Sequence, residues 1–318
     1  MKIILFVTNM FPTANNPFFG IFIKEQIDSL KKFFSFNENI YFINGLHKSK
    51  FEYLKSIFLI PYWVIKHKPD FIHIHYGISG LFLLFFRPKV PVFLTLHGCD
   101  FQDHGDNRIQ VWVSKIIAKK VDQIFVQNKV MKDLGMLINP NTQILTCGVD
   151  TEFFDPLKSD RLSFDKKVIV FPSNPSREEK NFPLFSKVIK QLESDLGENV
   201  IVKFIDKMSR SEIRDLLSSA DCLVMTSISE GSPQVIKEAL SCSLPVVSVP
   251  VGNVAEMIDG VPNCYVSSNY EVNELVKLVI MVLHGSKEGI RDSFLGKNVY
   301  DNENIAFMLA EYYQLPRI

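Results

Sequence analysis

Several features that mark particular protein classes are missing from this 318-residue sequence. Its five cysteines, at 99, 147, 222, 242 and 264, include no C-x-x-C pair, which excludes the usual disulfide frameworks and zinc sites. No H-E-x-x-H and no D-x-D triplet occurs, so we expect no metal ion and no other cofactor. No G-x-G-x-x-G follows the first apolar run, which disfavours a dinucleotide-dependent dehydrogenase.

Long hydrophobic runs are missing as well. The most apolar region, residues 76–98, is interrupted by Arg87, Pro88, Lys89 and Pro91, and the pieces are too short to span a bilayer. The first residues, MKIILFVTNMFP, contain one lysine and no small-residue cleavage site, so we interpret them as a strand and not as a signal peptide. Together with the unpaired cysteine pattern, these absences favour a cytoplasmic protein.

The net charge is zero, but the charged residues are unevenly distributed along the chain. Residues 1–150 hold 17 Lys and Arg against 11 Asp and Glu, which leaves 18 against 24 in the remainder. Such asymmetry indicates an anionic partner for the first half, although solvated surface charge is the alternative. We predict a peripheral contact with the anionic inner face of a membrane, and no nucleic-acid partner. The residues behind this prediction are Lys31, Lys32, Lys48, Lys50, Lys55, Lys66 and Lys68, with Phe33, Phe34, Phe58, Tyr62 and Trp63.

Short apolar runs alternate with stretches of helical period along the chain, which is typical of parallel strands covered by helices. The pattern lapses into charged and turn-forming residues around 147–167 and then starts again. We therefore expect two doubly wound α/β domains that face a cleft, with ligands beyond the carboxyl ends of the strands. The expected strands are 3–7, 40–43, 71–75, 92–96, 123–127, 143–146, 168–172, 201–205, 222–226, 245–249 and 264–266.

The segment SEGSPQVIKEALS, residues 229–241, follows one of these expected strands. Ser232 is a preferred N-cap residue and Pro233 suits the first helical position, so we predict that a helix starts there. Its apolar side chains should face the core, and its polar ones, Gln234 and Glu238 among them, form a separate stripe.

The start of this helix is suited to a diphosphate. Free amides of residues 231–234, except Pro233, which has no N–H, combine with the helix dipole to attract a phosphate group. Glu238 points back toward the helix start, where its carboxylate can accept hydrogen bonds from paired ribose hydroxyls. Glu230 lies on the other side and can do the same for a sugar. This combination indicates a nucleotide-sugar site, although two glutamates around a helix start also occur by chance.

Glu230 and Glu238 match the E-x7-E motif of retaining glycosyltransferases of the GT-B fold. EGSPQVIKEALSCSLPVVSVPVGNVAEMI resembles family four of that class, glycosyl transferases group 1, along its whole length. The resemblance implies a fold of two Rossmann-like domains: an acceptor domain at 1–152, a nucleotide-sugar domain at 153–300 and a returning helix at 301–318. Five other segments occur in the order that the family uses: VTNMFP...GIFIKEQ, FIHIHYGISG, LTLHGCDF, CGVDTEFFDP and FPSNPSREEKNFPLF.

Roles for individual residues of the second domain follow from the resemblance. It implies that Glu230 contacts the donor sugar, that Glu238 contacts the ribose, and that the amides from Gly231 onward hold the diphosphate. Lys180 matches a family lysine that neutralises the departing diphosphate. Where the family has an arginine five positions earlier, this chain has a proline, and the nearest candidate is Arg177. Either Arg177 serves from a shifted loop or the site has one fixed cation.

In the first domain the resemblance points to strand ends. His97, in HGCD, matches a family histidine near the donor sugar, although a histidine at such a position is usually structural. His75 and Tyr76 are candidates for the acceptor pocket, whereas we expect His73 to be packed. Gly20 follows the loop after the first strand, where the family brings backbone close to the diphosphate or acceptor; simple helix entry is the alternative.

The sequence thus predicts transfer of a sugar from a nucleoside diphosphate to a hydroxyl, with retention of anomeric configuration and without a metal. The expected partners are a UDP- or GDP-linked sugar and a glycan acceptor, preferably lipid-linked and destined for a surface polysaccharide. A sugar-nucleotide epimerase of the same architecture and a non-catalytic nucleotide-binding module remain alternatives.

Overall fold

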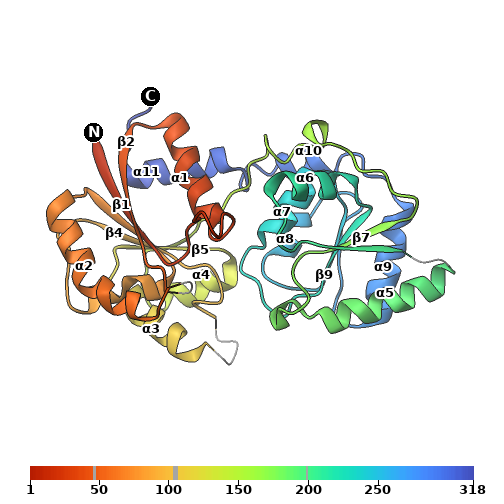
Figure 1. Cartoon of the computed structure of the whole chain (residues 1–318), viewed down its shortest axis with the longest axis horizontal. Coiled ribbons are helices and arrows are strands. Elements are labelled where there is room, and N and C mark those ends of the chain that lie inside the picture. The colour runs from red at the N-terminus through yellow and green to blue at the C-terminus, as the bar shows by residue number, and fades with distance from the viewer. Residues whose placement is uncertain (46–47, 103–106, 198–199) are drawn as a thin grey trace. The chain divides into compact units, whose positions relative to one another are not determined.

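The computed structural model describes residues 1–45, 48–102, 107–197 and 200–318. It divides into two compact units: unit 1 comprises Met1–Gly148 and Asn302–Ile318, and unit 2 comprises Val149–Asp301. Each unit is a parallel sheet with helices on both faces (Figure 1). The predicted α/β, doubly wound class is therefore confirmed. The units divide next to the boundaries expected at 152 and 300.

Unit 1 contains a six-stranded sheet in the order β2-β1-β3-β4-β5-β6, with every neighbouring pair parallel. Parallel strands are buried on both faces, which explains why they occur in the sequence as short continuous apolar runs. The strands are β1 (Lys2–Thr8), β2 (Phe36–Phe42), β3 (Phe71–His75), β4 (Val92–Thr95), β5 (Gln123–Val126) and β6 (Thr142–Ile144).

Strand β1 illustrates how both faces of this sheet are covered. Leu5 and Val7 join a cluster with α2 (Phe51–His67), η1 (Gly77–Leu84), α3 (Arg108–Ala118) and α4 (Lys129–Met136). Ile4 and Phe6, which alternate with them, join a second cluster with α1 (Ile21–Phe33) and α11 (Asn302–Tyr313). The period of two along one strand therefore supplies two separate hydrophobic cores.

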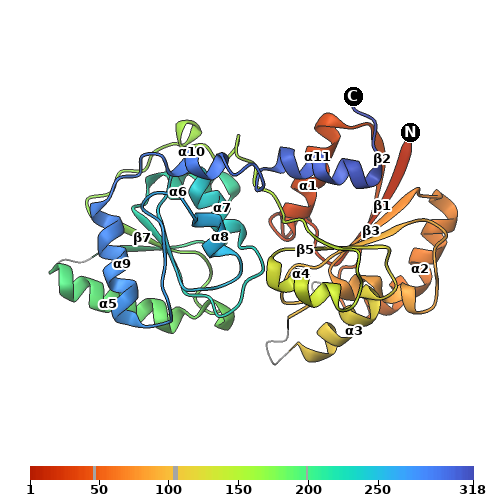
Figure 2. The same cartoon turned by 180° about the vertical axis from the view of Figure 1, so that it is seen from behind.

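The last helix, α11, belongs to unit 1 although it follows all of unit 2 in the sequence. It packs against α1, and both views show the two helices side by side (Figure 2). Ser29 Oγ donates to the carbonyl of Asn302 at 3.0 Å, and Lys2 Nζ donates to the carbonyl of Tyr313 at 2.9 Å. These contacts hold α11 in unit 1.

Unit 2 contains a five-stranded parallel sheet in the order β11-β10-β9-β7-β8. Its strands are β7 (Val168–Phe171), β8 (Ile201–Phe204), β9 (Cys222–Met225), β10 (Val246–Ser248) and β11 (Tyr265–Val266). Its helices are η2 (Pro156–Lys158), η3 (Glu178–Lys180), α5 (Phe182–Leu196), α6 (Arg210–Ser219), α7 (Gln234–Ser241), α8 (Val254–Ile258), α9 (Val272–His284) and α10 (Ile290–Leu295).

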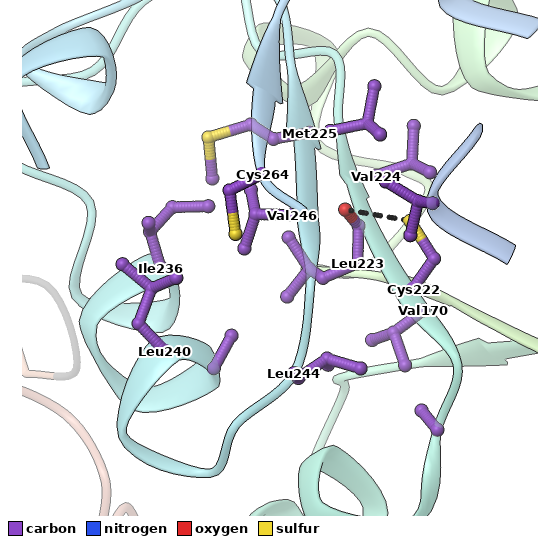
Figure 3. Packing of buried hydrophobic residues seen from close by; sticks show 14 of the residues in the cluster. Val170, Cys222, Leu223, Val224, Met225, Ile236, Leu240, Leu244, Val246 and Cys264 are labelled. Carbon is purple, nitrogen blue, oxygen red and sulfur yellow. Dashed lines mark hydrogen bonds between the residues drawn. The ribbon is translucent and has the colours of Figure 1, made fainter. Parts of the chain in front are cut away.

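Helix α7 is anchored to this sheet by its apolar stripe. Ile236 and Leu240 are completely buried and turn toward strands β9 and β10, where Leu223 and Val246 lie (Figure 3). Burying each such side chain contributes about 1.5–3 kcal/mol to folding. The predicted stripe is confirmed, and it fixes the polar positions of α7 relative to the strand ends.

The described part of the chain contains no helix that is both long and apolar enough to cross a bilayer.

Candidate active site

The strand order of unit 2 creates a natural binding position between β7 and β9. These strands are neighbours in the sheet, but β8 lies between them in the sequence. The chain leaves β7 toward β8 on one side and leaves β9 toward β10 on the other, so the two loops diverge at the carboxyl ends. Lys180 follows β7 and Glu230 follows β9, and both predicted site residues therefore lie at this switch point.

Lys180 and Glu230 form an ion pair across the switch point. Lys180 Nζ lies 2.5 Å from Glu230 Oε1, and the side chains are 12% and 13% exposed. The backbone joins the same two loops, since Thr226 Oγ1 donates to the carbonyl of Lys180 at 3.0 Å and Ile228 N donates to that of Glu179 at 2.9 Å. A cation and a carboxylate are thus held side by side on a braced backbone.

Arg177 does not join this pair. Its guanidinium bonds to the carboxylate of Glu179, with Nε 2.8 Å from Oε1, and its side chain is 56% exposed. Of the two alternatives left open by the sequence, this geometry favours a site with one fixed cation, Lys180.

Helix α7 starts one residue later than the sequence predicted. Its first residue is Gln234, Pro233 occupies the N-cap position, and no side chain caps the helix. The prediction that Ser232 is the N-cap was therefore wrong. Pro233 has an extended ψ of 119°, which carries Ser232 away from the first-turn amides. Ser232 Oγ is buried and has no hydrogen-bond partner in the described part of the chain.

Glu238 is held by a residue that sequence reasoning missed. Its side chain is only 6% exposed, and Oε1 bonds to Nη1 of Arg210. The guanidinium of Arg210 also lies over the ring of Phe154, 4.5 Å from its centroid, where a cation is attracted to the aromatic face. Arg210 is the first residue of α6, directly after the N-cap Ser209. Ser209 and Glu212 have the spacing of a capping box in the sequence, which marks this helix start but does not indicate a contact between Arg210 and Glu238.

Gly252, in the loop after β10, sets the position of Glu230. Its φ is +56°, in the left-handed region that favours glycine, and a Cβ there would lie 2.8 Å from the carbonyl oxygen of Gly231. The same Cβ would lie 3.2 Å from the Cβ of Glu230. The loops after β9 and β10 therefore pack backbone to backbone beside the site. Nothing in the sequence pattern alone distinguished this glycine.

The candidate residues of unit 1 gather around a buried carboxylate. Asp100 Oδ1 accepts hydrogen bonds from the amides of His97 at 2.8 Å and Gly98 at 3.0 Å, and Oδ2 accepts one from Gly77 at 3.0 Å. Burial raises the pKa of Asp100 to about 6, although these amides favour the charged form. Asp100 thus links the loops after β3 and β4 and positions His97.

Three histidine rings of unit 1 stack on one another. His75 lies between His73, at a centroid distance of 4.4 Å, and His97, at 5.6 Å. His73 bonds to Thr95 Oγ1 at 2.7 Å and to the hydroxyl of Tyr313, so it is packed as expected. Burial lowers the pKa of His73 to about 3 and that of His75 well below its usual range. Both rings are therefore neutral near pH 7.

His75 is completely buried, which contradicts its predicted place in the wall of an acceptor pocket. The period of two along β3 points it, like His73, into the core, and only Tyr76 reaches the surface. Tyr76 has a φ of +76°, a strained value for a residue with a Cβ, and its ring stacks on His97 at 6.2 Å.

Gly20 makes a close approach to the chain itself. It precedes α1 with a φ of +69°, and a Cβ there would lie 2.5 Å from the carbonyl of Met10. The glycine therefore lets α1 pack on the loop that follows β1, which supports the helix-entry alternative.

Comparison with known proteins identifies the family and the fold of the chain. The model of the family "Glycosyl transferases group 1" matches residues 120–298, and that of "Glycosyltransferase Family 4" matches residues 35–153. The chain therefore belongs to the glycosyl transferases group 1 family. TuaC of Bacillus subtilis, named as a glycosyltransferase of teichuronic acid biosynthesis, is 23% identical over 216 residues. That match covers 59% of this chain and 55% of TuaC, so the chain spans about half of this relative.

Solved structures share the whole fold at low sequence identity. A sucrose-phosphate synthase from Thermosynechococcus elongatus has a TM-score of 0.78 at 15% identity, with 99% of this chain and 98% of that chain covered. HepE of Anabaena, in complex with UDP, has a TM-score of 0.67 at 15% identity, with 99% and 100% covered. These likenesses confirm the predicted GT-B fold.

Proposed function

We propose that this protein transfers a sugar from a nucleoside-diphosphate sugar to a hydroxyl, with retention of the anomeric configuration. One observation carries the proposal: at the switch point of unit 2, Lys180 pairs with Glu230, which precedes α7, and Glu238 within α7 is buried and paired with Arg210. Family membership and the UDP complex of a protein with the same fold support a nucleotide-sugar donor.

In this proposal the leaving diphosphate binds between Lys180 and the first turn of α7. Lys180 leaves Glu230 for a phosphate oxygen, and the first-turn amides and dipole of α7 contribute further positive charge. Ser232 Oγ, which has no partner among the described residues, donates to the same group. Glu230, released from Lys180, accepts hydrogen bonds from the sugar. Glu238, aligned by Arg210, accepts those of the ribose.

The reaction breaks the bond between the anomeric carbon and the diphosphate oxygen and forms one from that carbon to the acceptor oxygen. The acceptor proton passes to the leaving diphosphate on the same face of the sugar. Charge builds on the diphosphate as the bond stretches, and preorganised donors stabilise it by about 3–4 kcal/mol each. His97, in unit 1, remains a predicted contact of the donor sugar.

Positive charge from Lys180 and α7 replaces, in this proposal, the charge that a metal ion supplies in other enzymes. Turnover should therefore persist in excess EDTA. Loss of turnover on chelation, with recovery on addition of Mg²⁺ or Mn²⁺, would contradict a metal-independent reaction.

For the acceptor we propose a lipid-linked glycan destined for a surface polysaccharide, reached from the cytoplasmic side of the membrane. The basic charge of the first half and the name of TuaC support this choice. A membrane-bound acceptor would require the enzyme to work at a lipid surface.

A donor panel tests the proposal. The protein is incubated with UDP-, GDP- and ADP-sugars, with and without a lipid-linked acceptor, and free nucleotide and product configuration are measured. Acceptor-dependent release of nucleotide with retained configuration is expected. Conversion of the donor without acceptor would identify an epimerase, and binding without turnover would identify a non-catalytic module.

A further inference from the structure

The outward face of helix α2 in unit 1 is more apolar than a surface helix requires. Six large apolar or aromatic side chains lie along it, and their exposure runs from 44% for Leu59 to 77% for Phe58. They are Phe51, Leu54, Phe58, Leu59, Tyr62 and Ile65. Spacings of three, four and seven residues place Phe51, Leu54, Phe58, Tyr62 and Ile65 on one stripe, and Leu59 lies at its edge. Only Ser56 and Ile60 of this 17-residue helix are fully buried.

The other aromatic residues that the sequence associated with a membrane do not lie on the outward face of α2. Phe34 is buried, and Phe33 and Phe34 both pack on Phe307 of α11. Trp63 turns inward and meets Tyr41 edge to face at 5.2 Å. The outward apolar surface therefore belongs to α2 alone among these segments, and exposed patches of this kind mark interaction sites.

Charge on the stripe identifies the kind of partner. Lys55 and Lys66 lie eleven positions apart on the same face, and Lys50 and Lys68 flank the two ends of the helix. The ammonium of Lys66 stays near the ring of Tyr62, at 5.9 Å. Glu52, bonded to Lys55 at 2.8 Å, is the single acidic residue of the helix. An apolar, aromatic stripe with lysines at its edge is complementary to an anionic lipid surface, in which the rings enter and the ammonium groups meet headgroups.

We propose that α2 docks unit 1 onto an anionic bilayer, with the axis of the helix parallel to the membrane plane. Phe51, Leu54, Phe58, Tyr62 and Ile65 enter the headgroup boundary, and Lys55 and Lys66 bind lipid phosphates. The inference rests on the proposed function for its purpose, because a lipid-linked acceptor is presented at such a surface. Its physical basis is independent of catalysis.

Vesicle co-sedimentation of the full chain tests the proposal. At low salt the protein should sediment with vesicles of phosphatidylcholine in which about one lipid in three is phosphatidylglycerol, and remain in solution with phosphatidylcholine alone. The double variant Phe58→Ser, Ile65→Ser should lower the partition coefficient at least tenfold, because each side chain loses its burial in the headgroup boundary. Leu137→Ser, at an 85% exposed residue of the same unit, is the matched control and should change nothing.

Variants that remove lysine charges distinguish docking onto anionic lipid from non-specific hydrophobic adsorption. Lys55→Gln, Lys66→Gln should reduce binding roughly fivefold per lysine, and added salt should reproduce the loss. Lys187→Gln, Lys190→Gln, at exposed positions of α5 in unit 2, should leave binding unchanged. All four variants should unfold at the wild-type temperature, because the altered side chains are exposed.

Three outcomes would overturn the proposal: no sedimentation of the wild type, equal binding to neutral vesicles, or equal binding of the α2 variants. A concentration-dependent dimer that dissociates on Phe58→Ser, Ile65→Ser without vesicle binding would assign α2 to an interface between two copies. Binding of a nucleoside diphosphate, measured by calorimetry, should persist in the α2 variants, because the proposed donor site lies in unit 2. Its absence in the wild type would therefore contradict the proposed function while leaving the docking result unaffected.

Discussion

Replacing Lys180 by Met tests the chemistry of the switch point most directly. In this structure Lys180 is bonded to Glu230, and the proposed reaction transfers that bond to the leaving diphosphate. Methionine keeps the length of the side chain but removes its charge. Arg177 lies in the same loop and carries the same charge, but it is exposed and bonded to Glu179, which makes Arg177→Met a matched control.

The expected changes in affinity and in kcat follow from the hydrogen bonds that Lys180 breaks and forms. On donor binding it gives up one charge-assisted hydrogen bond and forms another, so substrate affinity should change less than about tenfold. In the transition state the charge on the diphosphate grows, and a missing donor costs about 3–4 kcal/mol, or about 10²–10³ in kcat. An exposed ion pair is worth only about 0–1 kcal/mol, so Arg177→Met should cost at most about fivefold.

Steady-state kinetics with the donor found in the panel measures both quantities, with kcat and KM determined from nucleotide release. Isothermal titration with the nucleoside diphosphate shows whether the Lys180→Met site still folds and binds. A kcat within tenfold of the wild type would refute the reasoning, as would an equal loss for Arg177→Met.

Three other predictions concern the supports of the site. Replacing Glu238 by Ala should weaken binding of a nucleoside diphosphate by about 10–100-fold and leave that of its 2′,3′-dideoxy analogue unchanged, because hydrogen bonds to the ribose hydroxyls are lost; calorimetry measures both affinities. Gly252→Ala should lower kcat/KM and cost about 1–3 kcal/mol in unfolding free energy, since the new Cβ strains the backbone and pushes on Gly231; urea unfolding and kinetics report the two effects. Unfolding free energy should also fall between pH 7 and pH 5, because buried His73 and His75 stay neutral when folded but gain protons below about pH 6.5 when unfolded; urea titrations at both pH values measure it.

Each of these predictions has its own control. Gly260→Ala has the same left-handed φ, at +71°, but open space around the new Cβ, so it should cost stability and leave kcat/KM unchanged. For the pH effect, a folded pKa of about 3 makes His73 responsible for about 2 kcal/mol between pH 7 and pH 5. Asp100 opposes it by about 1 kcal/mol, because its raised pKa favours folding as the pH falls. His75→Phe should flatten the dependence, and an unchanged slope would count against a neutral buried His75. If Glu238→Ala weakened binding of the nucleoside diphosphate and of its 2′,3′-dideoxy analogue equally, the ribose role of Glu238 would be contradicted.

Local patterns were sufficient for most of the fold. Strands β1, β3, β7 and β9 were predicted within one or two residues of their ends, because a parallel strand buried on both faces must be apolar throughout. Ser209 and Glu212 have capping-box spacing in the sequence, which predicts the start of α6, and both hydrogen bonds of that capping box are present. The start of α7 was predicted within one residue, but Pro233 and not Ser232 occupies the N-cap position, with an extended ψ of 119°.

Local patterns did not predict which side chains contact one another. Arg210 and Glu238 are 28 positions apart, and Asp100 is 23 positions from the amide of Gly77, so no local period relates them. The burial of His75 and the outward stripe of α2 depend on which face of each element meets the core. A short period is satisfied by either face until the neighbouring helices are in place.

The sequence alone was sufficient to predict the class of fold, the order of the helices and strands, and the strand ends at which Lys180, Glu230 and Glu238 occur. Periodicity, turn residues and motif spacing act over a few residues, so they can be recognised without the tertiary structure. Only the tertiary structure decided that Lys180 pairs with Glu230, that Arg210 holds Glu238, and that the aromatic face of α2 points outward. Those outcomes depend on distances between segments far apart in the chain, which packing sets and local sequence does not encode.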